Sequence, residues 1–185
     1  MHWADFAALT LSKRGDKHII ASGITPSGEF HIGHLREILT GDMVTRACED
    51  AGLDAEFVFI VDSADPLRKV YPFLSDEYQQ YIGCPLATIP APDENGRPSS
   101  DGRSYAQHFL EPFLAALEQI DVRPRIIDNY TSYSNGEFAE RSRIACEKAD
   151  EIREIIERVS GRELPSDWFP FNPYGHNGSL DGVTV

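Results

Sequence analysis

The sequence lacks long apolar runs, and no stretch approaches the roughly 20 apolar residues that a membrane-spanning helix requires. Residues 1–5 carry neither a basic segment nor an apolar one, which argues against a secretory signal. Cysteine is scarce too: the three are scattered, with a spacing that matches neither a disulfide framework nor a zinc site. We therefore expect a cytoplasmic protein without a protein-bound metal, whose cysteines are small buried side chains.

Basic residues are also in short supply. The chain has 17 Lys and Arg against 30 Asp and Glu, a net charge of −13. Contacts from basic side chains to phosphate dominate nucleic-acid affinity, so the chain as a whole is a poor RNA binder. An RNA substrate would need a local basic face or a segment outside these residues. With 185 residues, 41% of them hydrophobic, the chain suits one folded domain with a buried core.

The order of apolar patterns predicts an α/β fold. Short apolar segments at 17–22 and 55–62 indicate parallel strands, and the helical period at 35–50 indicates the crossover helix of a right-handed βαβ unit. Residues 65–104 lack sustained periodicity and predict an irregular insertion with one short helix near 75–81. Beyond it the patterns predict further elements: a helix at 105–120, a strand at 125–128 and one long helix at about 136–159.

The segment from Gly23 to His34 joins the first strand to the first helix. Helix N-termini attract anions because they expose unpaired N–H groups, so a tight turn at 26–28 followed by a helix start near His31 predicts a phosphate site. His31 and His34 share one face of that first turn, and Gly33 between them lets a ligand approach the backbone. Pairs of histidines at this spacing are more often structural. The zinc-protease and dinucleotide-binding signatures are both absent.

The string T-P-S-G-E-F-H-I-G-H at 25–34 resembles the "HIGH" signature of class I aminoacyl-tRNA synthetases. The surrounding segments resemble the class I lysyl-tRNA synthetases in particular, at 2–5, 35–37, 61–70, 85–86, 89–93 and 167–173. The HIGH string specifies only the superfamily, whereas D-x-x-D-P-L-R-K-V at 62–70 points to lysine. The resemblance implies a Rossmann-like catalytic domain whose first part is residues 1–173, with 174–185 starting a truncated segment.

The resemblance also implies a reaction. L-lysine condenses with ATP, accompanied by Mg²⁺, to lysyl-adenylate, and lysine then passes to tRNA(Lys). His31 and His34 would be catalytic donors to the phosphates, and Thr25 would lie between ATP and the amino acid. The implied ATP-binding residues are Gly23, Thr25, Pro26, Ser27, Gly28, His31, Gly33 and His34.

A buried lysine ammonium requires carboxylate partners. Asp62 and Asp65 follow the second strand, at the edge where open α/β sheets bind ligands, and with Thr25 they form the predicted substrate site. Asp65 also suits an Asp-Pro turn. Glu29 and Glu37 are weaker candidates. Arg68 and Lys69 are either solvated charges or residues that contact phosphate or the tRNA acceptor end.

The chain departs from the family in three respects. Nothing matches the lysine-rich K-M-S-K-S signature, the 185 residues contain no anticodon-binding region, and residues 174–179 hold no cysteine-rich knuckle. We therefore expect an N-terminal fragment or a shortened form, weak or inactive by itself, with most tRNA contacts outside it. Two alternatives stay open: a non-catalytic fragment that binds ATP or a partner, and another HIGH-type nucleotidyltransferase. The aromatic tail at 164–173 is expected to pack on a partner surface.

Overall fold

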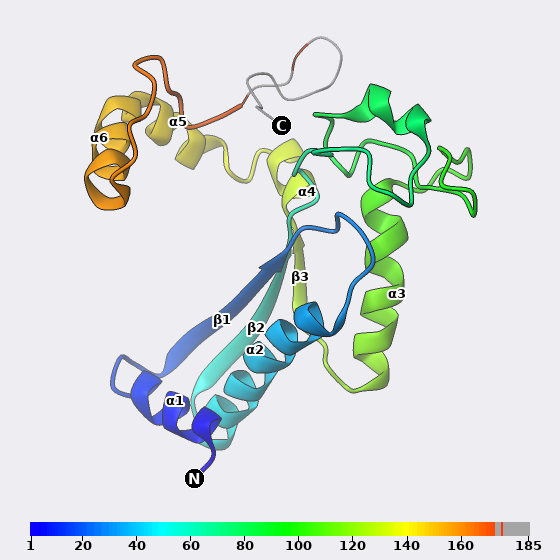
Figure 1. Cartoon of the computed structure of the whole chain (residues 1–185). Coiled ribbons are helices and arrows are strands. Elements are labelled where there is room, and N and C mark those ends of the chain that lie inside the picture. Colours follow the sequence, from blue (N-terminus) through cyan, green and yellow to red (C-terminus); the bar gives the residue numbers. More distant parts are fainter. Residues whose placement is uncertain (173–174, 176–185) are drawn as a thin grey trace.

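A computed structural model describes residues 1–172 and 175 of the chain. Three parallel strands form one sheet in the order β1 (Lys17–Ile24), β2 (Asp54–Val61) and β3 (Arg125–Asp128). Helix α2 (Ile32–Asp50) connects the first two strands, and α3 (Tyr105–Gln119) leads into the third (Figure 1). The predicted α/β fold with a parallel sheet is confirmed. The predicted start of a further segment at 174–185 lies outside the described residues, apart from Gly175.

The main core lies between the sheet and the two connecting helices. Alternate residues of β2 point to one face, where they meet α2 and α3. Right-handed crossovers that progress in one direction along a sheet place their helices on the same face, as observed. The buried members of this cluster are Ile24, Ile38, Phe57, Phe59, Val61, Phe113, Leu117 and Val122.

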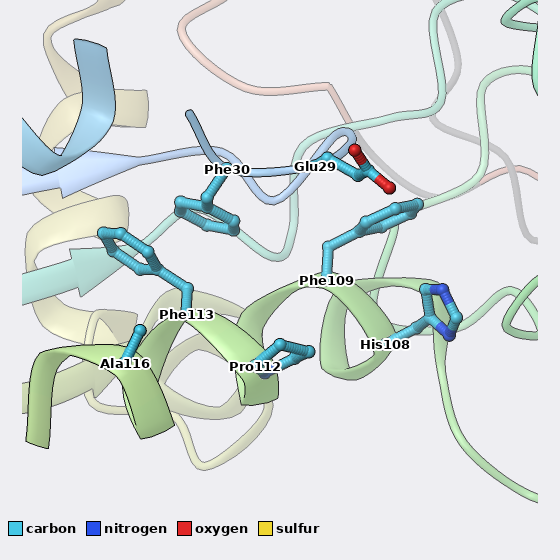
Figure 2. A pocket seen from close by; sticks show the side chains of 7 residues that line it. All are labelled: Glu29, Phe30, His108, Phe109, Pro112, Phe113 and Ala116. Atoms are coloured by element: carbon cyan, nitrogen blue, oxygen red, sulfur yellow. The ribbon is translucent and has the colours of Figure 1, made fainter. Parts of the chain in front are cut away.

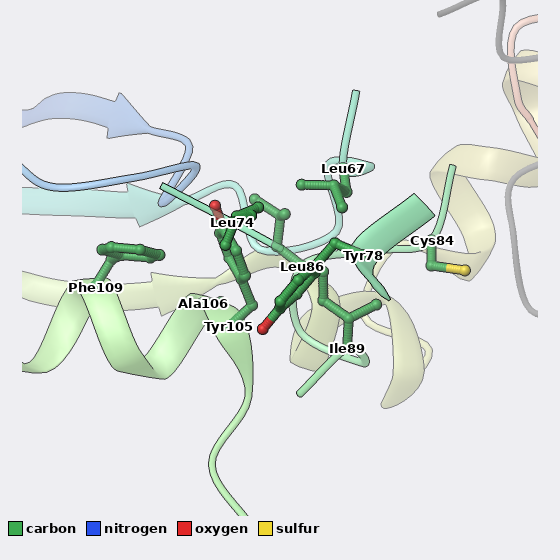
Figure 3. Packing of buried hydrophobic residues seen from close by; sticks show 9 residues of the cluster. All are labelled: Leu67, Leu74, Tyr78, Cys84, Leu86, Ile89, Tyr105, Ala106 and Phe109. Carbon is green, nitrogen blue, oxygen red and sulfur yellow. The ribbon is translucent and has the colours of Figure 1, made fainter. Parts of the chain in front are cut away.

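The insertion predicted at 65–104 is irregular but well packed. It contains the 3₁₀ helix η1 (Asp76–Tyr81) and three isolated antiparallel bridges. Its side chains form a second core with the first turns of α3 (Figure 3). Tyr78 is fully buried, and its hydroxyl donates to the Pro90 carbonyl at 2.9 Å. The insertion is therefore anchored to the helix that also packs against the sheet.

Helix α1 (Trp3–Leu11) was not among the predicted elements. A reciprocal cap begins it: the His2 ring accepts from the Ala4 N–H, and the Asp5 carboxylate accepts from the His2 N–H. Ala4 and Ala8 are buried against α2. The capping pair was a signal in the sequence that could have revealed this helix.

The single long helix predicted at 136–159 is wrong. The structure has α4 (Asn129–Ser134), α5 (Ala139–Glu147) and α6 (Ala149–Ser160), and the last two are separated at Lys148. Neither α5 nor α6 contains a buried residue, so no packing against the sheet constrains them to continue as one rod, and they extend away from it (Figure 1). Apolar periodicity specifies a helix face but not its continuity. Within the described ranges, no helix has the length and apolar content needed to cross a bilayer.

Candidate functional site

The candidate site lies at the carboxyl edge of the sheet. Because the strands are parallel, all three end at the same edge, at Ile24, Val61 and Asp128, and α2 begins there too. Open α/β sheets bind ligands at this edge. A cavity of about 340 Å³ opens here, lined by Gly23, Ile24, Thr25, Ser27, His34, Glu37, Pro66, Arg68 and Tyr71.

The two histidines of the 25–34 segment cap α2 together. The Nδ1 atom of His31 accepts from the Gly33 N–H at 3.1 Å, and Nδ1 of His34 accepts from the His31 N–H at 3.1 Å. Their rings stack with centroids 3.9 Å apart. Since both Nδ1 atoms accept, each neutral ring carries its proton on Nε2. Two Nε2–H donors can therefore be offered to an anion at the positive end of the helix.

Burial and charge keep His34 neutral. Partial burial, and secondarily the neighbouring His31, lower the pKa of His34 below its ordinary value, while Glu37 acts in the opposite direction. The neutral imidazole, with its single proton on Nε2, is therefore favoured at pH 7, consistent with Nδ1 acting as an acceptor.

Gly33 has a packing reason to lack a side chain. A Cβ atom there would lie 2.8 Å from Cε1 and 2.9 Å from Nδ1 of His31. Such a contact would displace the His31 ring from its capping position. The sequence reasoning assigned Gly33 to ligand approach, and the structure adds the space that the capping ring itself needs.

The structure brings together the carboxylates predicted to bind substrate. Thr25 Oγ1 donates to Asp65 Oδ2 at 2.6 Å, and a Cβ on Gly23 would lie 3.6 Å from Asp62 Oδ2. Burial, with a further contribution from Asp65, raises the pKa of Asp62 above its ordinary value. A cation placed between the two carboxylates would oppose both the burial cost and the repulsion from Asp65, since it stabilises the charged forms of the two groups.

Asn129 is a site residue that sequence reasoning missed. Its Nδ2 donates to Asp62 Oδ1 at 2.8 Å, and its Oδ1 accepts from the Ala64 N–H at 2.9 Å. Ser63, which is buried, donates from Oγ to the carboxylate of Asp128. These bonds join the ends of β2 and β3. The signal was available, because Asp128 ends the predicted third strand at the same sheet edge and Asn129 follows it.

Three residues of the predicted ATP set shape the turn. Pro26 is fully buried, and a Cβ on Gly28 would lie 3.6 Å from the Phe73 ring of the insertion. The Ser27 carbonyl accepts from the Tyr105 hydroxyl at 2.8 Å. Only Ser27 of the three also lines the cavity. Their contact with ATP stays a prediction, as does that of the other predicted site residues.

The remaining charged candidates lie at different places in the structure. Glu37 and Arg68 line the cavity at the sheet edge. The Nη2 atom of Arg68 lies 4.0 Å from Oδ2 of Asp65. Glu29 lies at a different cavity, against α3 (Figure 2). The Lys69 ammonium lies 5.6 Å from the centre of the Tyr71 ring. Within residues 1–172, no group of three or more His, Cys, Asp or Glu side chains is arranged to hold a metal ion.

Comparison with known proteins points to one family. The chain matches the family described as tRNA synthetases class I (K) over residues 1–185. It is 45% identical to the lysine–tRNA ligase of Methanosarcina barkeri over 94% of this chain and 31% of that protein. Its identity to the lysine–tRNA ligase of Archaeoglobus fulgidus is 46%, over 100% of this chain and 36% of that protein.

The chain spans about a third of the length of the curated relatives it matches. The match nonetheless extends through every strand of the sheet and through the whole 25–34 segment. The capped α2 terminus and the carboxylates lie at the same sheet edge within this matched region. The family match and the identities to these relatives show that the chain belongs to the class I lysyl-tRNA synthetase family.

Proposed function

We propose that this chain is the nucleotide- and lysine-binding part of a lysine–tRNA ligase. The observation that carries the proposal is a juxtaposition: the histidine-capped terminus of α2 and the Asp62–Asp65 pair meet at one sheet edge, beside one cavity. The proposed substrates are MgATP, L-lysine and tRNA(Lys). Most contacts to tRNA(Lys) would lie outside these residues, and the proposed location is the cytoplasm.

The activation step needs donors where phosphate charge develops. A carboxylate oxygen of lysine attacks the α-phosphorus, the bond from that phosphorus to the bridging oxygen breaks, and pyrophosphate leaves. Charge grows on the phosphoryl oxygens, so fixed donors lower the barrier. In this proposal the Nε2–H groups of His31 and His34 are those donors. Their Nδ1 bonds to the backbone hold both rings before the substrate arrives.

Lysine recognition is assigned to Asp62 and Asp65. Asp62 is partly buried beside a second carboxylate, which disfavours its charged form until a cation is present. The Asn129 amide fixes Asp62, and the Thr25 hydroxyl fixes Asp65. A lysine ammonium between them would find two oriented acceptors.

Replacing Asp62 with Asn should raise thermal stability at pH 7 while weakening lysine binding by about tenfold or more. In the folded state the pKa of Asp62 is raised above its ordinary value of 3.8, so the folded protein binds more protons than the unfolded chain. The stability contributed by protonated Asp62 is therefore lost as pH rises through the raised pKa. Asn removes this loss and still accepts from Asn129, but leaves one charge fewer for the ammonium.

Melting curves from pH 4 to pH 8 and calorimetry with lysine measure both effects. Glu37→Gln is the matched control, because Glu37 is a carboxylate that lines the cavity at this sheet edge without belonging to the Asp62–Asp65 pair. A larger loss of lysine affinity in Glu37→Gln than in Asp62→Asn would contradict the assignment.

A pyrophosphate-exchange assay with each amino acid tests the proposed reaction. Exchange that depends on lysine alone is the expected result for the proposed ligase. Exchange with no amino-acid preference would reject it in favour of another HIGH-type nucleotidyltransferase.

The second candidate for this chain taken alone is a non-catalytic ATP-binding fragment, favoured by the lack of a K-M-S-K-S string in its 185 residues. ATP binding by calorimetry without any exchange would support that candidate.

A further inference from the structure

An unbroken series of aromatic contacts joins the main core to the histidine cap. The Phe30 ring stacks on Phe113 with centroids 4.2 Å apart and an interplanar angle of 14°. Phe30 also meets the His34 ring edge-on, at 5.1 Å and 60°. His34 in turn stacks on His31 at 3.9 Å, and Phe113 meets Phe59 of β2 at 6.3 Å. Phe30 is the one link between the core and the cap in this series.

The surroundings of Phe30 show what fixes its position. The residue is half-buried and borders the cavity against α3, which has a volume of about 340 Å³ (Figure 2). A side chain beside open space is held by the contacts on its packed sides. For Phe30 these include the buried Phe113 and the half-buried His34. An aromatic ring between them resists displacement of either, because paired rings prefer specific relative orientations.

We infer that Phe30 is a positioning residue for His34: its ring, stacked on Phe113, holds the His34 imidazole where Nδ1 accepts from the His31 N–H and Nε2–H faces the ligand side. The inference rests on the proposed role of His34 toward ATP phosphate. It assigns Phe30 a task beyond filling the core. A residue that only filled the core would affect stability alone.

The electrostatic state of His34 supplies an independent readout. Its pKa is lowered first by burial, and the Phe30 ring is part of what covers it. The charged or titratable groups that act on it are His31, stacked against it, and Glu37, one turn later on α2. Removing the ring admits water to His34 without altering those two groups. The pKa of His34 should then rise toward its ordinary value.

The test compares Phe30→Leu with Phe109→Leu in the full 185-residue chain. Phe109 borders the same cavity and packs on Tyr105 and His108, so its truncation is a matched loss of one ring. Imidazole NMR, with His34 assigned by a His34→Gln spectrum, follows its pKa and tautomer, and calorimetry follows ATP affinity. We expect Phe30→Leu to raise the pKa of His34 and weaken ATP binding about threefold to tenfold. Phe109→Leu should leave the pKa and the tautomer of His34 unchanged, and Phe30→Tyr, which keeps the ring, should match the unmodified chain in both measurements.

The outcomes separate this inference from the proposed function. An unchanged His34 pKa and tautomer in Phe30→Leu would overturn the positioning role. A changed pKa or tautomer of His34 with unchanged ATP affinity would support the positioning role and reject the assignment of His34 to phosphate. Should Phe30→Leu fail to fold, Phe30→Met carries the same expectations, because its flexible side chain fills the space without a ring.

Discussion

Replacing His31 with Ala is expected to weaken ATP binding by about tenfold to a hundredfold, the effect of losing one hydrogen bond to a charged group. The loss has two sources. The Nε2–H donor disappears, and so does the Nδ1 acceptor that caps α2 through the Gly33 N–H. Removing a cap costs about 1 kcal/mol of stability by itself. His34→Ala should weaken ATP binding to a similar degree, since its Nδ1 holds the same turn through the His31 N–H.

Two control variants separate the phosphate contact from the cap. His31→Asn keeps a good capping side chain without the imidazole, so it should retain most of the stability and still lose ATP affinity. His2→Ala removes the equivalent histidine cap from α1, at the other end of the sheet. It should lower the melting temperature with no effect on ATP. Equal ATP affinity in His31→Ala and the unmodified chain would reject the phosphate role.

Gly96→Ala is expected to destabilise the fold by about 3 kcal/mol, because two costs add at this position. Gly96 has φ +73°, a left-handed conformation that disfavours Ala, and a Cβ there would lie 2.2 Å from the Phe73 carbonyl oxygen. That atom belongs to the backbone, so it moves only if the insertion rearranges. The Gly96 carbonyl also accepts from the Ser75 N–H at 2.8 Å, just before η1. The melting temperature should fall by about 10 °C.

Gly102→Ala is the matched control for the clash. Gly102 has φ +85°, but a Cβ there would meet no atom within 4 Å. It should therefore show only the conformational cost, about 1 to 2 kcal/mol. Equal losses in the two variants would show that the close approach to Phe73 is relieved at no cost. The insertion packs against Tyr105 of α3, whose hydroxyl donates to the Ser27 carbonyl, so Gly96→Ala should also weaken ATP binding.

Local pattern predicted much of the fold and the candidate site. The strands, both crossover helices and the irregular insertion follow from apolar periodicity and turn residues, which act within a few positions of one another. The strand, turn and helix start at 25–34 were predicted for the same reason, since they are contiguous in the chain. Helix α1 was missed although its His2–Asp5 cap is equally local. The division into α5 and α6 was missed because periodicity does not record where a helix is interrupted.

Sequence pattern alone was therefore enough to predict the α/β framework, the strand-to-helix segment at 25–34 and the family. The tertiary structure alone decided that Asn129 orients Asp62, that Glu29 faces a different cavity from Glu37, and that Phe30 links the core to His34. These relations join residues on separate elements. They depend on strand order, register and helix packing, which place side chains far apart in the chain within hydrogen-bonding or van der Waals distance.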